Sequence, residues 1–182
     1  MDVVFATSNK HKAMELSHLI GFKVKMAKVE LDELQALSVR TVAAAKVKEA
    51  YKKVNKPVVV DDTGIHIDSL NGFPGAFAKW FVEGLGHEGI CRLMDRYKSR
   101  DAYAETCIAF CDGKIVKVFS GRVRGTIALH PRGNANLRWD SIFIPKGYKK
   151  TFGEMTTEEK SKISMRGIAV HKLKRFLELR HH

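Results

Sequence analysis

The chain reads Val-Val-Val-Asp-Asp-Thr-Gly at residues 58–64, and this stretch decides the class of fold that we expect. Three β-branched residues in a row predict a strand that is buried on both faces. The polar residues Asp61-Asp62-Thr63-Gly64 come at the carboxyl end of that strand, where ligands of open α/β sheets bind. Because successive side chains of an extended segment point to opposite faces, Asp61 and Asp62 are not expected to act as one dyad.

One of these two carboxylates is expected to face a cleft beyond the end of the strand. A carboxylate in that position can hold Mg²⁺ through its oxygens or accept a proton from attacking water. A second interpretation fits the local sequence equally well, in which the aspartates cap an ordinary turn.

A strand, a polar loop and a helix are predicted at the start of the chain. The apolar run at 3–6 leads into Thr7-Ser8-Asn9, and apolar residues then recur at helical spacing until Gly21. The free N–H groups at such a helix start attract anions. Lys10 and Lys12 stand in the first turn, where acidic residues are normally favoured, which indicates a phosphate site. The alternative is an ordinary cap with solvated lysines, since the loop lacks the glycines of a Walker motif.

The remaining elements predict a mixed α/β chain that forms a single domain over residues 1–182. Asp112-Gly113 between two strand-like runs indicates a hairpin, so a purely parallel, doubly wound sheet does not fit. The predicted elements are a helix over Glu33–Val54, a turn at 71–75, a short helix over Glu88–Tyr97, strands over Ala102–Cys111, Ile115–Arg124 and Trp139–Ile144, and a last helix that opens with a Thr156/Glu159 capping box and ends near Leu179.

A third candidate region combines Trp139 and Asp140 with the last helix. An aromatic ring can stack on a base, and an aspartate accepts hydrogen bonds from base N–H groups. Lys160 and Arg166 are six residues apart, so both serve one ligand only if the helix bends or ends near Arg166, which Gly167 would permit. The alternative is a core tryptophan beside a solvated, charged helix.

Composition narrows the class of protein. Lys and Arg number 32 against 20 Asp and Glu, which gives a net charge of +12 and favours anionic partners, although a basic solvated surface also explains it. The chain start does not resemble a secretory signal, and no apolar run is long enough to cross a bilayer. The three cysteines form no paired framework. We therefore expect a cytoplasmic protein with reduced, buried cysteines and no membrane partner.

Taken together, these segments resemble the inosine/xanthosine triphosphate pyrophosphatases, the Ham1-like family. The similarity runs in order along nearly the whole chain, and five motifs in order are very improbable by chance. The matching segments are Thr7-Ser8-Asn9 with Lys12 and Glu15, Val60–Ile65 followed by Leu70–Gly75, Ser120-Gly121 with Gly125–Ile127, Trp139–Phe143, and Thr151–Met155 followed by Glu158–Lys160 and Ser164–Gly167.

The resemblance implies an enzyme with two lobes on a long curved mixed β-sheet, flanking helices, a central substrate groove and a homodimeric assembly. It would hydrolyse non-canonical purine nucleoside triphosphates (ITP, dITP, XTP) to the monophosphate and pyrophosphate, with Mg²⁺ as cofactor. Asp62 would be the proton acceptor and a Mg²⁺ ligand, with Asp61 nearby. The implied substrate-binding residues are Thr7, Ser8, Asn9, Lys10, His11, Lys12, Thr63, Trp139, Asp140, Lys160 and Arg166.

This chain departs from the family pattern at three places. Met165 replaces the histidine between the conserved serine and arginine, and Leu137-Arg138 replaces Phe-Gly before the aromatic-Asp pair. Arg40 aligns where the second helix usually supplies an acidic metal ligand, whereas a shifted register brings in Glu33. These departures motivate one alternative, a divergent member that binds another nucleotide with weak or no hydrolysis. The charge motivates another, a nucleic-acid-binding module, although no recognisable motif supports it.

Overall fold

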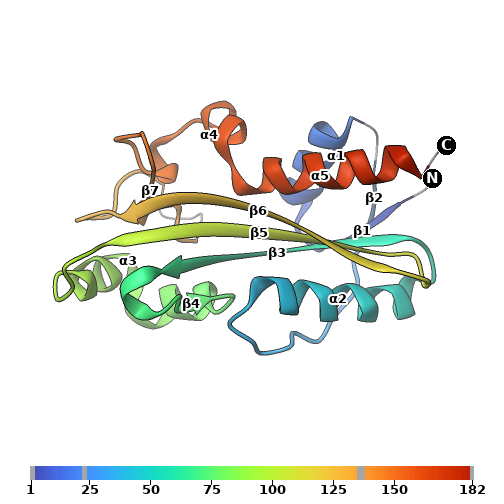
Figure 1. The fold of residues 1–182 in the computed structure, drawn as a ribbon, viewed down its shortest axis with the longest axis horizontal. Helices are drawn as coiled ribbons and strands as arrows, with labels where there is room; N and C mark the ends of the chain where they lie inside the picture. The colour runs from blue at the N-terminus through green and yellow to red at the C-terminus, as the bar shows by residue number, and fades with distance from the viewer. Residues whose placement is uncertain (1–2, 22–23, 135–137, 181–182) are drawn as a thin grey trace.

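The computed structural model describes residues 3–21, 24–134 and 138–180, and the side chains of Lys10 and His11 are not part of this description. Within it, seven strands form one mixed sheet in the order β2-β1-β3-β5-β6-β7, and β4 pairs with β3 (Figure 1). β1 runs parallel to β2 and β3, and all other pairs are antiparallel. The strands are β1 (Val4–Ala6), β2 (Lys25–Ala27), β3 (Val58–Ile67), β4 (Pro74–Gly75), β5 (Asp101–Cys111), β6 (Val116–Ile127) and β7 (Phe143–Pro145).

Helices cover both faces of this sheet. α1 and α5 lie on one face, and α2 and α3 lie on the other (Figure 1). The α-helices are α1 (Lys10–Ile20), α2 (Val39–Val54), α3 (Ala78–Met94), α4 (Thr157–Ile163) and α5 (Met165–Leu179), and the 3-10 turns are η1 (Asp68–Leu70), η2 (Asp140–Ile142) and η3 (Phe152–Glu154). The mixed α/β prediction with flanking helices is confirmed, whereas the substrate groove stays a prediction.

The core divides along the three long strands β3, β5 and β6. At one end, two apolar clusters pack on opposite faces, one under α1 and α5 and the other under α2. At the other end a third cluster joins these strands to α3, β7 and η3. This division agrees with two lobes that share one sheet. Every helix in the described ranges is too short or too polar to traverse a lipid bilayer.

The motif Asp61-Asp62-Thr63-Gly64 lies within a strand and not beyond its end. Residues 61–64 were expected beyond a strand end, but β3 continues through them to Ile67 because β5 pairs with it throughout, with Asp62 opposite Cys107. The strand end that we expected belongs instead to the parallel neighbour β1, which stops at Ala6. Gly64 is required within the strand, since a Cβ there would lie 2.4 Å from the carbonyl oxygen of Gly75.

The second helix begins later than predicted. Its start is Val39 and not Glu33, because the Ser38 side chain accepts a hydrogen bond from the N–H of Thr41 and caps the helix there. Its buried face is Val39, Val42, Ala43, Val47 and Ala50, which differs from the stripe that the leucines of the preceding loop predicted. Leu34 and Leu37 are half-exposed in that loop.

The short helix predicted over Glu88–Tyr97 is the second half of α3. Gly86 has φ 68° and ψ 165°, so a kink separates the predicted segment from an earlier helical piece that the glycine-rich sequence concealed. The strand predicted over Trp139–Ile144 is also revised, because a turn of 3-10 helix (η2) precedes the short strand β7.

The last predicted helix is two helices. The Thr156/Glu159 capping box is present at the start of α4, as predicted. Ser164 then leaves the helical conformation, and its hydroxyl accepts a hydrogen bond from the N–H of Gly167 to begin α5. The break allows Lys160 and Arg166 to lie on different helices, which resolves the angular conflict between them.

Candidate functional site

Asp61 is the centre of a buried ion-pair cluster between three distant segments. Its side chain is 4% exposed, and it accepts a hydrogen bond of 2.9 Å from Lys12 Nζ at the start of α1. Its second oxygen accepts from Arg166 Nε at 3.3 Å and Nη2 at 3.1 Å. Arg166 also donates to Glu15 at 2.7 Å. The cluster therefore ties β3 to α1 and α5.

The charges in this cluster stabilise one another. Burial alone would raise the pKa of Asp61, but Lys12 and Arg166 outweigh it and hold that pKa below its ordinary value. Burial lowers the pKa of Lys12, with Arg166 and Arg138 adding to the effect and Asp61 opposing it. Asp61 is thus ionised at neutral pH and is a poor proton acceptor.

Asp62 points to the opposite face of β3, as the alternation of strand side chains requires. Its carboxylate lies 4.0 Å from Lys46 Nζ on α2, and the same ammonium is 3.3 Å from Glu33. Burial raises the pKa of Asp62 to about 6, with Lys46 opposing and Asp61 adding to the rise. A carboxylate of this basicity remains mostly ionised at neutral pH yet accepts a proton readily.

The Asp62 carboxylate and its neighbours fit a magnesium ion. Mg²⁺ in proteins takes one or two carboxylates and completes its shell with water and substrate phosphates. The Lys46 ammonium already lies between two carboxylates, Glu33 and Asp62, as a shared cation would. Among the described residues no group of three or more His, Cys, Asp or Glu gathers as a metal centre, so the protein alone provides an incomplete shell.

Asp140 and Lys160 form a second ion pair, between η2 and α4. Burial raises the pKa of Asp140 above its ordinary value, and Lys160 opposes this rise. The neighbouring Trp139 is 2% exposed, and its ring packs edge-on against Phe143. The tryptophan ring therefore packs in the core, whereas the neighbouring Asp140 belongs to the polar cluster.

The opening loop adjoins Asp61 more closely than Asp62. Asn9 caps α1 by accepting from the N–H of Lys12, and Thr7 Oγ1 accepts from the N–H of Asn9. Ser8 is exposed. The side chains of Lys10 and His11 lie outside the described part of the chain. Thr63 is buried and shares a hydrogen bond of 3.0 Å with Thr106, so its hydroxyl already has a protein partner.

Comparison with known proteins identifies the relationship. Residues 3–176 match the Ham1 family. The chain belongs to this family. It is 41% identical over 182 residues to the inosine triphosphate pyrophosphatase of Yarrowia lipolytica, covering 97% of this chain and 96% of that protein. It is 38% identical over 178 residues to the dITP/XTP pyrophosphatase of Hyperthermus butylicus, covering 96% and 94% respectively.

A solved Ham1 structure supports the same conclusion. The Staphylococcus aureus Ham1 protein superposes with a TM-score of 0.87 at 26% identity, over 99% of this chain and 100% of that one. The departures from the Ham1 pattern can now be placed. Met165 is buried and begins α5, and Arg40 is exposed and donates to Ser120 at 3.4 Å. Leu137 lies outside the described residues.

Sequence reasoning missed Lys46, and it gave Glu15 no function. Lys46 lies one turn after Val42 on the buried side of α2, so a lysine in an apolar stripe was the available signal. The helix had been predicted in the wrong register, and the signal was therefore lost. Of the two positions considered for a second acidic metal ligand, Glu33 shares Lys46 with Asp62, whereas Arg40 donates to Ser120.

Proposed function

We propose that this Ham1 protein hydrolyses the non-canonical purine nucleoside triphosphates ITP, dITP and XTP to the monophosphate and pyrophosphate. The full-length similarity to an inosine triphosphate pyrophosphatase and to dITP/XTP pyrophosphatases is the observation that carries the proposal. The site supports it, since segments predicted to bind the phosphates and the base meet at Asp61 through Lys12 and Arg166. This hydrolysis would remove non-canonical purine triphosphates from the nucleotide pool.

In the proposed reaction, water attacks the α-phosphorus and the bond from that phosphorus to the α–β bridging oxygen breaks. Asp62 accepts the proton of the water, which its raised pKa favours. Lys12 and the N–H groups at the start of α1 offset the negative charge of the phosphates. Asp61 and Glu15 hold Lys12 and Arg166 in place and receive no proton themselves.

We propose Mg²⁺ as the cofactor, held by Asp62 with Glu33 as the second carboxylate. A bound Mg²⁺ would neutralise charge on the phosphate oxygens and lower the barrier to attack. Asp62 would then combine ligation with proton acceptance, as the family resemblance implies. Lys46 lies within ion-pair distance of both carboxylates.

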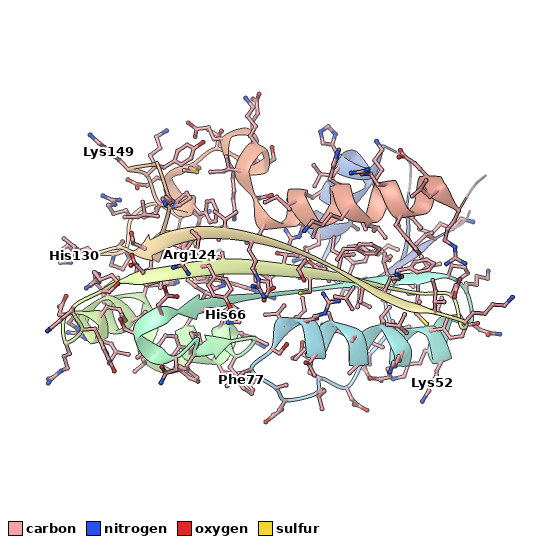
Figure 2. The ribbon with its side chains drawn as sticks, viewed as in Figure 1. Lys52, His66, Phe77, Arg124, His130 and Lys149 are labelled. Atoms are coloured by element: carbon pink, nitrogen blue, oxygen red, sulfur yellow. The ribbon has the colours of Figure 1, made fainter. Side chains whose placement is uncertain are left out.

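A homodimer is the proposed assembly. Phe73, Trp80 and Leu85 are 40%, 58% and 48% exposed and line a cavity of about 590 Å³ on α3 and the adjoining turn, on the side of the sheet where Phe77 is labelled (Figure 2). Leu37 adjoins this surface through a hydrogen bond from the N–H of Ala76 to its carbonyl oxygen, and Leu34 and Leu37 are 48% and 50% exposed. Apolar side chains gathered in this way are typical of homodimer interfaces, which are roughly 65% apolar.

The dimer has a direct test. Light scattering should give twice the 20.5 kDa chain mass, and Trp80→Glu should reduce it to the monomer mass. Tyr148→Glu is the control, because Tyr148 is a comparably exposed aromatic, 49%, in another region. A monomeric wild type would refute the dimer.

We also propose a cytoplasmic location, because Cys91, Cys107 and Cys111 are free and buried, which suits a reducing compartment.

The alternatives predict different results in one experiment. ITP, dITP, XTP and the four standard triphosphates are incubated with Mg²⁺, and pyrophosphate and orthophosphate are measured separately. The proposed function predicts pyrophosphate from the first three. Nucleotide-induced thermal stabilisation without pyrophosphate would indicate the divergent binder. Salt-sensitive binding of oligonucleotides that ITP does not displace would indicate the nucleic-acid-binding module, which the family membership does not favour.

A further inference from the structure

Arg138 occupies an unusual position beside the site. It has φ 53°, in the left-handed region that favours glycine, and its side chain is exposed. His87 Nε2 donates a hydrogen bond to its carbonyl oxygen and fixes the backbone. The next two residues are the buried Trp139 and the ion-paired Asp140. The backbone is therefore held from both sides while the guanidinium extends from it.

A non-glycine residue in this conformation carries steric strain that glycine would relieve. Strain of this kind persists where a side chain is needed, and it concentrates at functional positions. The Ham1 pattern that this chain resembles has glycine at the position of Arg138, so this chain carries a side chain where that pattern has none.

Four other cations of the site, whose side chains the structure describes, have carboxylate partners. Lys12 and Arg166 pair with Asp61, Lys46 is held between Glu33 and Asp62, and Lys160 pairs with Asp140. Among the described residues, no carboxylate lies within ion-pair distance of the Arg138 guanidinium. Arg138 is thus the cation of this group whose charge the described protein leaves unbalanced.

This unbalanced charge acts on both halves of the site. Burial raises the pKa of Asp140 and Arg138 opposes this rise, whereas burial lowers the pKa of Lys12 and Arg138 adds to the fall, so the guanidinium lies within electrostatic range of both groups. A bound anion would offset this excess of positive charge.

We propose that the Arg138 guanidinium binds the phosphate chain of the substrate, as an additional phosphate ligand that the Ham1 pattern lacks. The inference rests on the proposed function, because it assigns a residue to the same substrate. A guanidinium can also read the O6 and N7 acceptors of a 6-oxo purine. The phosphate chain is favoured because it carries the negative charge of the substrate, and an exposed guanidinium without a carboxylate partner binds phosphate oxygens through two parallel hydrogen bonds.

Binding of pyrophosphate distinguishes a phosphate contact of Arg138 from a base contact, because pyrophosphate has phosphate oxygens and no base. Its binding with Mg²⁺ is measured by calorimetry for the wild type, Arg138→Gly, Arg138→Gln and Arg138→Lys. Loss of one charge-assisted contact should raise the Kd for pyrophosphate about 10- to 100-fold in the Gly and Gln variants. Arg138→Lys should retain most of the affinity. The KM for ITP should rise in parallel.

Stability distinguishes this binding function from a structural one. Arg138→Gly removes strain, so its Tm should equal or exceed that of the wild type while its affinity falls. Asn55→Gly, at another left-handed residue with φ 51° at the end of α2, controls for strain relief and should leave Kd unchanged. Arg175→Gln, at an exposed arginine on α5, controls for net charge and should also bind normally.

Each outcome decides a specific claim. Wild-type affinity for pyrophosphate in Arg138→Gly and Arg138→Gln would overturn the proposal. Unchanged pyrophosphate binding with an altered ratio of ITP to ATP turnover would assign Arg138 to the base edge and also overturn it. Failure of the proposed function would appear differently, as a wild type that releases no pyrophosphate from ITP, dITP or XTP.

Discussion

Two adjacent aspartates on β3 occupy opposite environments. Asp61 faces α1 and α5 and is paired with Lys12 and Arg166. Asp62 faces α2, where its nearest cation is Lys46 at 4.0 Å. The pKa of the first is lowered because two cations outweigh its burial, whereas burial raises the pKa of the second to about 6.

The difference teaches how one strand can provide two carboxylates for two purposes. Side-chain alternation sends them to different faces, so neither has to serve as both anchor and reagent. A carboxylate held by two cations stabilises the fold and resists protonation. A carboxylate with a raised pKa, near only one distant cation, remains free to accept a proton or a metal ion.

The largest expected effect is on catalysis. Asp62→Asn should lower pyrophosphate release from ITP by about 10²- to 10⁴-fold, because the proposed proton acceptor and proposed metal ligand are both removed. Its fold should persist, since a buried carboxylate with a raised pKa destabilises the native state at neutral pH. Pyrophosphate release and circular dichroism measure the two results.

Asp68→Asn is the matched control for that variant, because Asp68 follows directly on β3 and forms a surface ion pair with Arg124. Arg124 lies on β6, away from α2 (Figure 2). The control should retain full turnover. An Asp62→Asn protein with wild-type turnover would show that the reactive carboxylate is elsewhere and would end the contrast between the two aspartates.

The second prediction concerns stability. Asp61→Asn leaves Lys12 and Arg166 partly buried without their shared partner, and breaking a buried pair in this way costs about 3–5 kcal/mol. For a chain of this size the Tm should fall by roughly 10 °C. Thermal unfolding measures the fall, and Asp62→Asn is the comparison. Equal Tm values for the two variants would contradict the assignment of Asp61 as the anchor.

The third prediction gives the two aspartates opposite pH dependence, without metal. The pKa of Asp62 rises on folding from 3.8 to about 6, so its unfavourable ionisation removes about 2–3 kcal/mol of stability as pH rises through this window. The pKa of Asp61 falls on folding, so its contribution is present above the unfolded value of 3.8 and is lost as pH falls below it.

These signs are checked by Tm measurements in EDTA between pH 3 and pH 8. Asp62→Asn should exceed the wild type at pH 7 and converge with it near pH 4. Asp61→Asn should be furthest below the wild type at neutral pH, with the gap narrowing at the acid end. Parallel curves for all three proteins would mean that neither carboxylate changes its pKa on folding.

Much of the fold followed from local patterns. The β-branched run at 58–60 and the Asp112-Gly113 turn predicted buried strands and a hairpin, and both are present because period and turn chemistry are local properties. The boundaries of the helices were harder to predict. The start of α2 depends on the Ser38 cap, and the leucines before it mimic a helical stripe although they are half-exposed.

The site was predictable as a set of segments but not as a set of contacts. The alternation rule separated Asp61 from Asp62, yet only tertiary structure shows which one meets Lys12, because α1 and α5 approach from a single side. Trp139 illustrates the opposite limit. A tryptophan beside an aspartate suits base stacking, but three-dimensional packing places its ring against Phe143 in the core.

The smallest expected effect tests whether Glu33 is the second carboxylate of the proposed Mg²⁺ site. Glu33→Gln should raise the Mg²⁺ concentration for half-maximal activity about tenfold, because one of two carboxylates around the metal is lost. Arg40→Gln should leave that concentration unchanged, since Arg40 contacts Ser120 and neither carboxylate. Mg²⁺ titrations of pyrophosphate release compare the two variants. An unchanged Mg²⁺ requirement in Glu33→Gln would contradict the assignment of Glu33 as a metal ligand. The pairing of Glu33 and Asp62 with Lys46 would then serve the fold alone.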